Sequence, residues 1–102
     1  MSSFTMNVTI TAERIQEVIE VGLETEEYSS FVVVDTFIPT LRDKYGDRSE
    51  ILALNTSARQ RGLDVLCKEY PLRALEILEG NDDVVTADIY IQCCVYGKVV
   101  YS

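Results

Sequence analysis

The adjacent thiols of Cys93 and Cys94 are the residues of this chain most suited to chemistry, because a thiolate is both a nucleophile and a metal ligand. A nucleophilic cysteine needs a general base beside it, and the 102 residues include no histidine, the commonest base. Neighbouring side chains on a helix point about 100° apart, so at most one of the two thiols could enter a given pocket. We therefore expect both cysteines to fill the core.

Metal sites are equally poorly supported by the residue types. A structural zinc site needs four sulfur or nitrogen ligands at a recognisable spacing, and the sequence has neither histidine nor a CxxC pair. The carboxylate pairs Asp82–Asp83 and Glu26–Glu27 lack the further oxygen ligands that calcium requires. No phosphate-binding glycine loop and no GxSxG motif is present. We expect no cofactor, and an enzyme is the least favoured of three function classes.

The acidic side chains are segregated along the chain. The net charge is −8, with clusters of carboxylates between Thr11 and Glu27 and again between Asn81 and Asp88. A phosphate backbone is bound by clustered lysine and arginine, so direct binding to nucleic acid is not expected. Segregated charge instead favours contact with a protein of opposite charge, although the same residues could simply solvate helix faces.

Two binding hypotheses follow from this charge pattern. The first is a non-enzymatic inhibitor whose acidic surface meets a basic surface on another protein; its residues would be Glu24, Glu26, Glu27, Tyr28, Asp82, Asp83 and Asp88. The second is an oligomeric binder of a nucleotide signal, in which phosphate would be held by Arg42, Arg48, Arg59 or Arg61. Six tyrosines suit interfaces, and a homodimer is one expected use of them.

The elements that must position these residues begin with strand and helix signals. Residues 3–10 (SFTMNVTI) alternate with period two and predict a strand, and Thr11 is a good cap for the helix that follows. The β-branched run at residues 31–38 (FVVVDTFI) predicts a buried strand that ends before Pro39. Residues 42–50 (RDKYGDRSE) read as an exposed loop, and residues 51–54 (ILAL) as a short strand paired with the previous one in a hairpin.

The next segment predicts two helices in succession. Asn55 is a good helix start, and Pro71 suits the first turn of a second helix that Gly80 would end. Gly62 costs about 1 kcal/mol inside a helix relative to alanine, so we expect a close backbone approach there.

The last stretch, residues 86–102 (TADIYIQCCVYGKVVYS), is ambiguous. Its β-formers slightly favour a strand. Thr86 is nevertheless a fair helix cap and Gly97 a fair helix end, which would leave KVVY as a short strand behind the helix.

A resemblance supports the second interpretation. The last 40 or so residues resemble the closing segment of a family of small accessory proteins of tailed bacteriophages, with a GL…YP stretch, an acidic NDD, then TAD, a glutamine, an aromatic–glycine pair and a VVY end. The matching positions here are Gly62, Leu63, Leu66, Glu69, Tyr70, Pro71, Asn81, Asp82, Asp83, Thr86, Ala87, Asp88, Gln92, Tyr96, Gly97 and Val99 to Tyr101.

The resemblance weakens after the first helix. The family carries a GGSNYW-like stretch where this chain has GLETEEYSS, which keeps only Gly22 and the aromatic Tyr28. The resemblance implies a phage protein made in the cytoplasm of the host bacterium that binds a host or defence protein. Family likeness alone does not establish a function.

Taken together, the patterns predict one α+β domain over residues 1–102: a small, mostly antiparallel sheet packed against three to four helices. The longest apolar runs are far shorter than the roughly 18 residues of a membrane span, so no membrane partner is expected.

Overall fold

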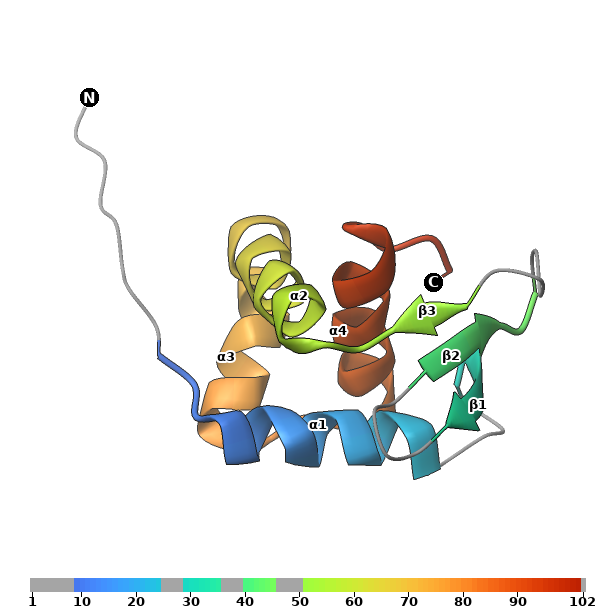
Figure 1. The fold of residues 1–102 in the computed structure, drawn as a ribbon. Helices are drawn as coiled ribbons and strands as arrows, with labels where there is room; N and C mark the ends of the chain where they lie inside the picture. Colours follow the sequence, from blue (N-terminus) through green and yellow to red (C-terminus); the bar gives the residue numbers. More distant parts are fainter. Residues whose placement is uncertain (1–8, 25–28, 36–39, 46–50, 102) are drawn as a thin grey trace.

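A computed structural model describes residues 9–24, 29–35, 40–45 and 51–101 of the chain (Figure 1). Its elements, in chain order, are α1 (Ala12–Glu24), β1 (Phe31–Asp35), β2 (Thr40–Asp43), β3 (Leu52–Ala53), α2 (Thr56–Glu69), α3 (Pro71–Glu79) and α4 (Val84–Tyr96). Four helices and one antiparallel three-stranded sheet form a compact α+β globule, which confirms the predicted fold class.

The helices form one part of the molecule and the sheet lies at one end (Figure 1). α1 runs beneath α2, α3 and α4, and the sheet stands beyond α4, near the carboxyl end of α1. α4 has the most extensive contacts, packing on both α2 and α1. Within the described residues, no helix is both long and apolar enough to cross a membrane.

The sheet differs from the predicted hairpin. Its order is β1-β2-β3, so β2 lies between the two strands that the sequence predicts to be neighbours. β2 pairs Leu41 with Val33 on one side and with Leu52 on the other. Arg42 and Asp43, predicted to open a loop, belong to this strand because they pair with Val32 and Phe31 of β1; Leu41 and Asp43 are buried, whereas Thr40 and Arg42 are only half-buried. The predicted hairpin between residues 31–38 and 51–54 and the predicted start of the loop at Arg42 were therefore wrong.

Two predicted strand segments lie wholly or partly outside the described residues. The strand predicted over residues 3–10 falls there except for Thr9 and Ile10, neither of which is in a strand. The strand predicted over residues 31–38 is observed as β1 up to Asp35, and its remaining three residues are not described.

Most of the predicted helix ends are confirmed. The Thr11 hydroxyl accepts a hydrogen bond from the Arg14 amide at 3.2 Å, and the Asn55 side chain accepts one from the Ala58 amide at 2.9 Å. α2 ends at Glu69, and a single residue, Tyr70, separates it from Pro71, which begins α3. Gly80 ends α3 in the left-handed conformation with φ 77°, which glycine adopts at little cost.

α4 begins earlier than predicted. Asp83, not Thr86, is its N-cap, because the Asp83 carboxylate accepts the Thr86 amide at 2.9 Å. Gly97 ends the helix with φ 71°, as predicted. Residues 98–101 do not form the predicted strand; the backbone groups of Val100 and Tyr101 bond instead to the side chain of Gln92.

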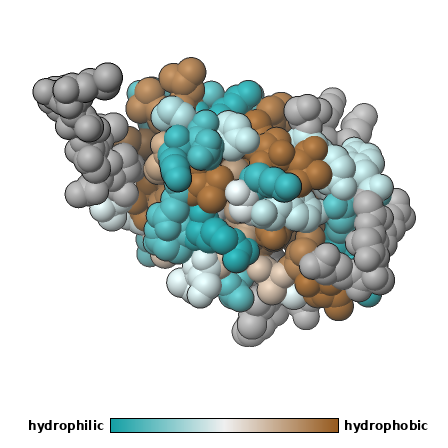
Figure 2. All heavy atoms as spheres, turned by 90° about the horizontal axis from the view of Figure 1, so that it is seen from above, coloured by the Kyte–Doolittle hydropathy of each residue, from teal (hydrophilic) through white to brown (hydrophobic). Residues whose placement is uncertain are grey.

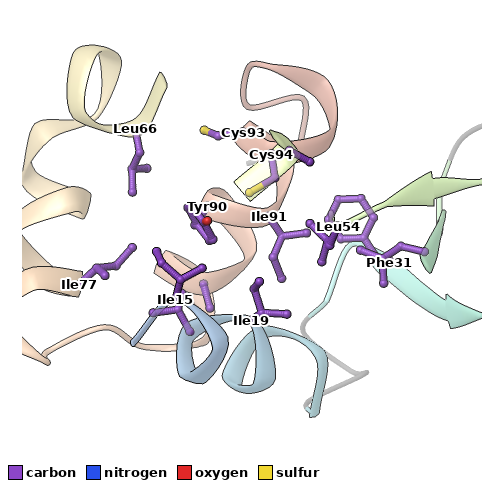
Figure 3. Close-up of a cluster of buried hydrophobic side chains, with 14 of the residues drawn as sticks. Ile15, Ile19, Phe31, Leu54, Leu66, Ile77, Tyr90, Ile91, Cys93 and Cys94 are labelled. Atoms are coloured by element: carbon purple, nitrogen blue, oxygen red, sulfur yellow. The ribbon is translucent and has the colours of Figure 1, made fainter. Parts of the chain in front are cut away.

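The core is built around α4 (Figure 3). Tyr90 and Ile91 are fully buried, as are Cys93 and Cys94, which confirms that both cysteines fill the core. α2 approaches α4 closely at Gly62, where an added Cβ would lie 2.3 Å from the Cys94 Sγ and 2.9 Å from the Cys94 Cα. The close approach predicted at this glycine is therefore confirmed.

Candidate functional site

The exposed side of α1 carries a row of carboxylates, which we call the acidic ridge. Its members recur at steps of four, three and four residues, so they share one face of the helix: Glu13, Glu17, Glu20 and Glu24. All four are exposed, while Ile15, Val18, Ile19 and Gly22 bury the opposite face. At a rise of 1.5 Å per residue, the ridge is about 16 Å long.

Little positive charge offsets the ridge. The Arg14 Nη1 donates to Glu17 at 3.1 Å, but the same guanidinium also donates to the Ile77 carbonyl at 3.2 Å and pairs with Asp82. Among the described residues, no ion pair involves Glu13, Glu20 or Glu24. Most of the negative charge of the ridge is thus left facing solvent.

The other predicted partner-binding carboxylates are used inside the fold. The Asp82 side chain is only 4% exposed and pairs with Arg14. Asp88 is buried, whereas Asp83 is exposed and caps α4. The Thr86 backbone N–H is the main cause that lowers the Asp83 pKa. Glu26, Glu27 and Tyr28 lie outside the described residues, so of the predicted surface Glu24 and Asp83 are the carboxylates seen exposed.

Among the described arginines of the nucleotide hypothesis, Arg59 and Arg61 do not share a cavity. Arg59 donates to the Leu54 carbonyl at 3.0 Å, and Arg61 donates to the Cys94 carbonyl at 3.0 Å. They line separate hollows of about 220 and 290 Å³. Arg42 lies on β2, and Arg48 is outside the described residues. These groups mainly join elements of the fold.

One open cavity, which we call the tail cleft, has a volume of about 620 Å³. It runs between α4, the end of α3 that carries Arg73, and the last residues of the chain; its lining is Ser30, Tyr45, Arg73, Val85, Asp88, Ile89, Val100 and Tyr101. Tyr45 is 64% exposed, Val85 50% and Val100 46%, a concentration of solvent-facing apolar groups at one place. Elsewhere too, hydrophobic patches interrupt the hydrophilic surface (Figure 2).

The floor of the tail cleft is a buried polar network. Asp88 Oδ1 accepts the Ser30 amide at 2.9 Å, and Oδ2 accepts the Ser30 hydroxyl at 2.7 Å and the Gln92 Nε2 at 2.9 Å. Gln92 also donates to the Tyr101 carbonyl and accepts from the Val100 and Tyr101 amides, at 2.8–2.9 Å. α4 thereby fixes both the start of β1 and the end of the chain.

A second carboxylate orders the aromatic wall of the tail cleft. Asp43 accepts hydrogen bonds from the Tyr101 hydroxyl at 2.7 Å, from the Tyr45 amide at 2.8 Å and from the Tyr96 hydroxyl. The hydrogen bond to Asp43 raises the pKa of Tyr101. The Tyr45 and Tyr101 rings meet edge to face with centroids 5.2 Å apart.

Arg73 stands at the other end of the tail cleft. Its Nη1 donates to the Thr86 hydroxyl at 3.1 Å and contacts Glu76 at 3.4 Å, and Thr86 in turn donates to Glu76 at 2.6 Å. Arg73 also contributes to the lowering of the Asp83 pKa, so its charge is shared between two carboxylates.

The thiols do not form a reactive site. Burial raises the pKa of Cys93 to about 11 and that of Cys94 to about 12, which keeps both protonated at neutral pH. Within the described ranges, no group of three or more cysteine or carboxylate side chains could hold a metal ion.

Sequence reasoning missed most of the tail cleft. Asp88 was predicted to bind a partner from the surface, but Arg73, Tyr45, Val85 and Val100 were not singled out. The regular spacing of the ridge was present in the sequence, whereas the residues of the tail cleft come from five separate elements that only the fold brings together. No family model, curated protein or solved structure matches the chain, so the resemblance to the bacteriophage family stays a prediction.

Proposed function

We propose that this protein is a non-enzymatic, phage-encoded accessory protein that binds and inhibits a host or defence protein through an acidic surface. The acidic ridge is the central part of that surface, extended by the acidic residues that follow Glu24 in the sequence. The partner would carry a basic surface of the kind that normally contacts the phosphates of nucleic acid.

The observation that carries this proposal is the unshared charge of the ridge. Carboxylates follow one another about every 4.5–6 Å along α1, and of the four ridge residues only Glu17 has an arginine partner in the described part of the chain. Such a row attracts a cationic protein over a distance set by the ionic strength, which speeds association and favours partners of opposite charge. Arg59 and Arg61, two of the arginines assigned to the nucleotide alternative, line different hollows, so the ridge has the stronger support.

A capture experiment tests the proposal. The tagged chain is used to pull down proteins from bacterial lysate, and the affinity of the captured partner is then measured at several salt concentrations. Replacing two ridge residues, Glu20→Gln with Glu24→Gln, should weaken binding about tenfold and flatten its salt dependence.

A matched pair of exposed acids controls for net charge. Glu69→Gln with Glu79→Gln removes the same charge from the ends of α2 and α3 and should change the affinity less than twofold. Equal losses for the two double variants would show that only net charge matters and would overturn the assignment to the ridge. Thermal-shift screening with cyclic and linear nucleotides tests the alternative function separately.

A further inference from the structure

We propose that the tail cleft binds a basic side chain, an arginine or a lysine, presented by a protein partner. This inference rests on the proposed function for the nature of the partner, but it assigns a second contact site outside the acidic ridge. It stands on the shape, the charge and the aromatic wall of the tail cleft.

The apolar part of the tail cleft suits the stem of such a side chain. Val85 and Ile89 succeed one another along α4, and Val100 faces the same cleft from the tail. Lysine and arginine bury aliphatic stems on apolar surface while their charged ends reach polar groups. A volume of about 620 Å³ is ample for one side chain and the neighbouring backbone of a partner.

The charge around the tail cleft favours a cation over an anion. Arg73 is the cation among the lining residues, and Glu76 contacts it at 3.4 Å. Asp83 senses the same guanidinium, and Asp88 lies in the floor. With Lys44 beside the Tyr45 ring and Asp43 bound to Tyr101 also counted, two positive charges stand against four carboxylates on and around the tail cleft, so an incoming anion would meet net repulsion.

The aromatic wall gives the positive end a place to bind. Tyr45 and Tyr101 present their rings to the tail cleft, and the centroid of the Tyr45 ring already has the Lys44 ammonium 5.9 Å away. A cation within about 6 Å of a ring centroid is attracted by its negative face. We therefore place the charged end of the partner's side chain at these rings, beside or in place of the Lys44 ammonium.

The tail cleft is also organised in advance. Tyr101 is held by its hydroxyl on Asp43 and by its backbone on Gln92, and Arg73 is held by Thr86. Because these groups are already ordered, binding loses little side-chain entropy.

The test is an NMR titration of the full 102-residue chain with capped pentapeptides, Gly-Gly-X-Gly-Gly, in which X is arginine, citrulline or glutamate. Citrulline has the shape of arginine without its charge. The arginine peptide should shift the amide signals of Ser30, Ile89 and Tyr101 in a saturable way, and the citrulline peptide should bind at least fivefold more weakly. Equal binding of arginine and citrulline peptides would overturn the proposal.

Two variants separate a cation site from an anion site. Tyr45→Leu removes an exposed ring and should weaken the arginine peptide roughly fivefold. Arg73→Gln removes the like charge, so the arginine peptide should bind as well or better. If the glutamate peptide binds more tightly than the arginine peptide and loses that binding in Arg73→Gln, the site is an anion site and the inference is wrong.

The ridge variant keeps this test independent of the proposed function. Glu20→Gln with Glu24→Gln leaves every residue of the tail cleft in place, so the arginine titration should not change. If the arginine peptide binds saturably but the ridge variant binds every captured partner as well as the wild type does, the proposed function of the ridge is wrong and the inference about the tail cleft stands. If none of the three peptides shifts the amide signals of the tail cleft, the inference is wrong, whatever the role of the ridge.

Discussion

The two sides of α4 are joined to the rest of the molecule in different ways. Towards α2, the contact is close and mainly apolar, with Gly62 against Cys94, and its hydrogen bonds run to backbone carbonyls, from Arg61 to Cys94 and from the Tyr90 hydroxyl to Arg59. Towards the sheet and the tail, the contacts are hydrogen bonds from the buried side chains of Asp88 and Gln92. The first contact is sensitive to added volume, and the second to the loss of a polar partner.

The hydrogen bonds of Asp88 and Gln92 explain how a short sheet is held against α4 although its strands pair over few residues. β3 contributes only two paired residues, and β1 is anchored at its start by Asp88 through Ser30. Gln92 bonds the tail with its amide group as a neighbouring strand would with its backbone. Asp88, Gln92 and Tyr101 are among the positions on which the predicted resemblance to phage proteins depends, and here they have structural roles.

The substitution Gly62→Ala breaks the apolar side and should have the largest effect. The new Cβ would lie 2.9 Å from the Cys94 backbone nitrogen, so the helices must separate. We expect the free energy of unfolding to fall by about 3 kcal/mol, despite the better helix propensity of alanine. Urea unfolding followed by circular dichroism measures it.

Gly22→Ala is the matched comparison on the α1 side of α4. There the nearest atom to an added Cβ is the Ile91 Cδ1 at 2.7 Å, the end of a flexible side chain. We expect a loss at least 1 kcal/mol smaller than for Gly62→Ala. Similar losses at the two glycines would show that the backbone contact with Cys94 is not the limiting one.

Gln92→Leu tests the polar side. Leucine keeps the volume but leaves the Val100 and Tyr101 amides without their acceptor. Stability should fall by about 2 kcal/mol, and hydrogen exchange at these two amides should become fast while α2 keeps its protection.

The exposed Gln60 of α2 supplies the control for this change. Gln60→Leu should alter stability by less than about 0.5 kcal/mol. If the tail amides stayed protected in Gln92→Leu, the tail would be held by other contacts, and the comparison between the two sides of α4 would fail.

Local signals predicted much of the helical part. Thr11, Asn55, Pro71 and Gly80 mark helix ends because caps and breakers act within one turn of the chain. α4 was harder to recognise because it is buried on nearly all sides and lacks an amphipathic period, and its cap at Asp83 lies three residues before the predicted one.

The sheet and the tail cleft depend on contacts between distant residues. β2 consists of four residues with two charged ones, and its identity as a strand comes from its partners β1 and β3. Likewise, nothing local pairs Gln92 with the tail or brings Arg73 near Tyr101. A buried glutamine or aspartate is recognisable from the sequence only once its partners are known.

Alkaline pH should weaken the apolar side through Cys94. Burial raises the Cys94 pKa to about 12, whereas the thiol of the unfolded chain ionises near 8.5. The contribution of the protonated Cys94 thiol to the free energy of unfolding is therefore complete below pH 8.5 and is lost as the pH rises through 12. Between pH 7.5 and 9.5 the wild type should lose about 1.4 kcal/mol more than Cys94→Ala, as measured by urea unfolding. Parallel losses would mean that the thiol ionises in the folded protein.

The smallest effect expected is at the N-cap of α4, on the polar side. Asp83→Ala should cost about 1 kcal/mol at pH 7, because the Thr86 amide loses its acceptor. That hydrogen bond lowers the Asp83 pKa below its usual value, so the contribution is present above about pH 4 and is lost as the pH falls through the lowered value. Asp83→Asn, which caps without charge, should keep most of the stability at pH 7. It should also lose less than the wild type between pH 5 and pH 2. An equal acid dependence for the two proteins would show that the charge of Asp83 does not cause the acid sensitivity.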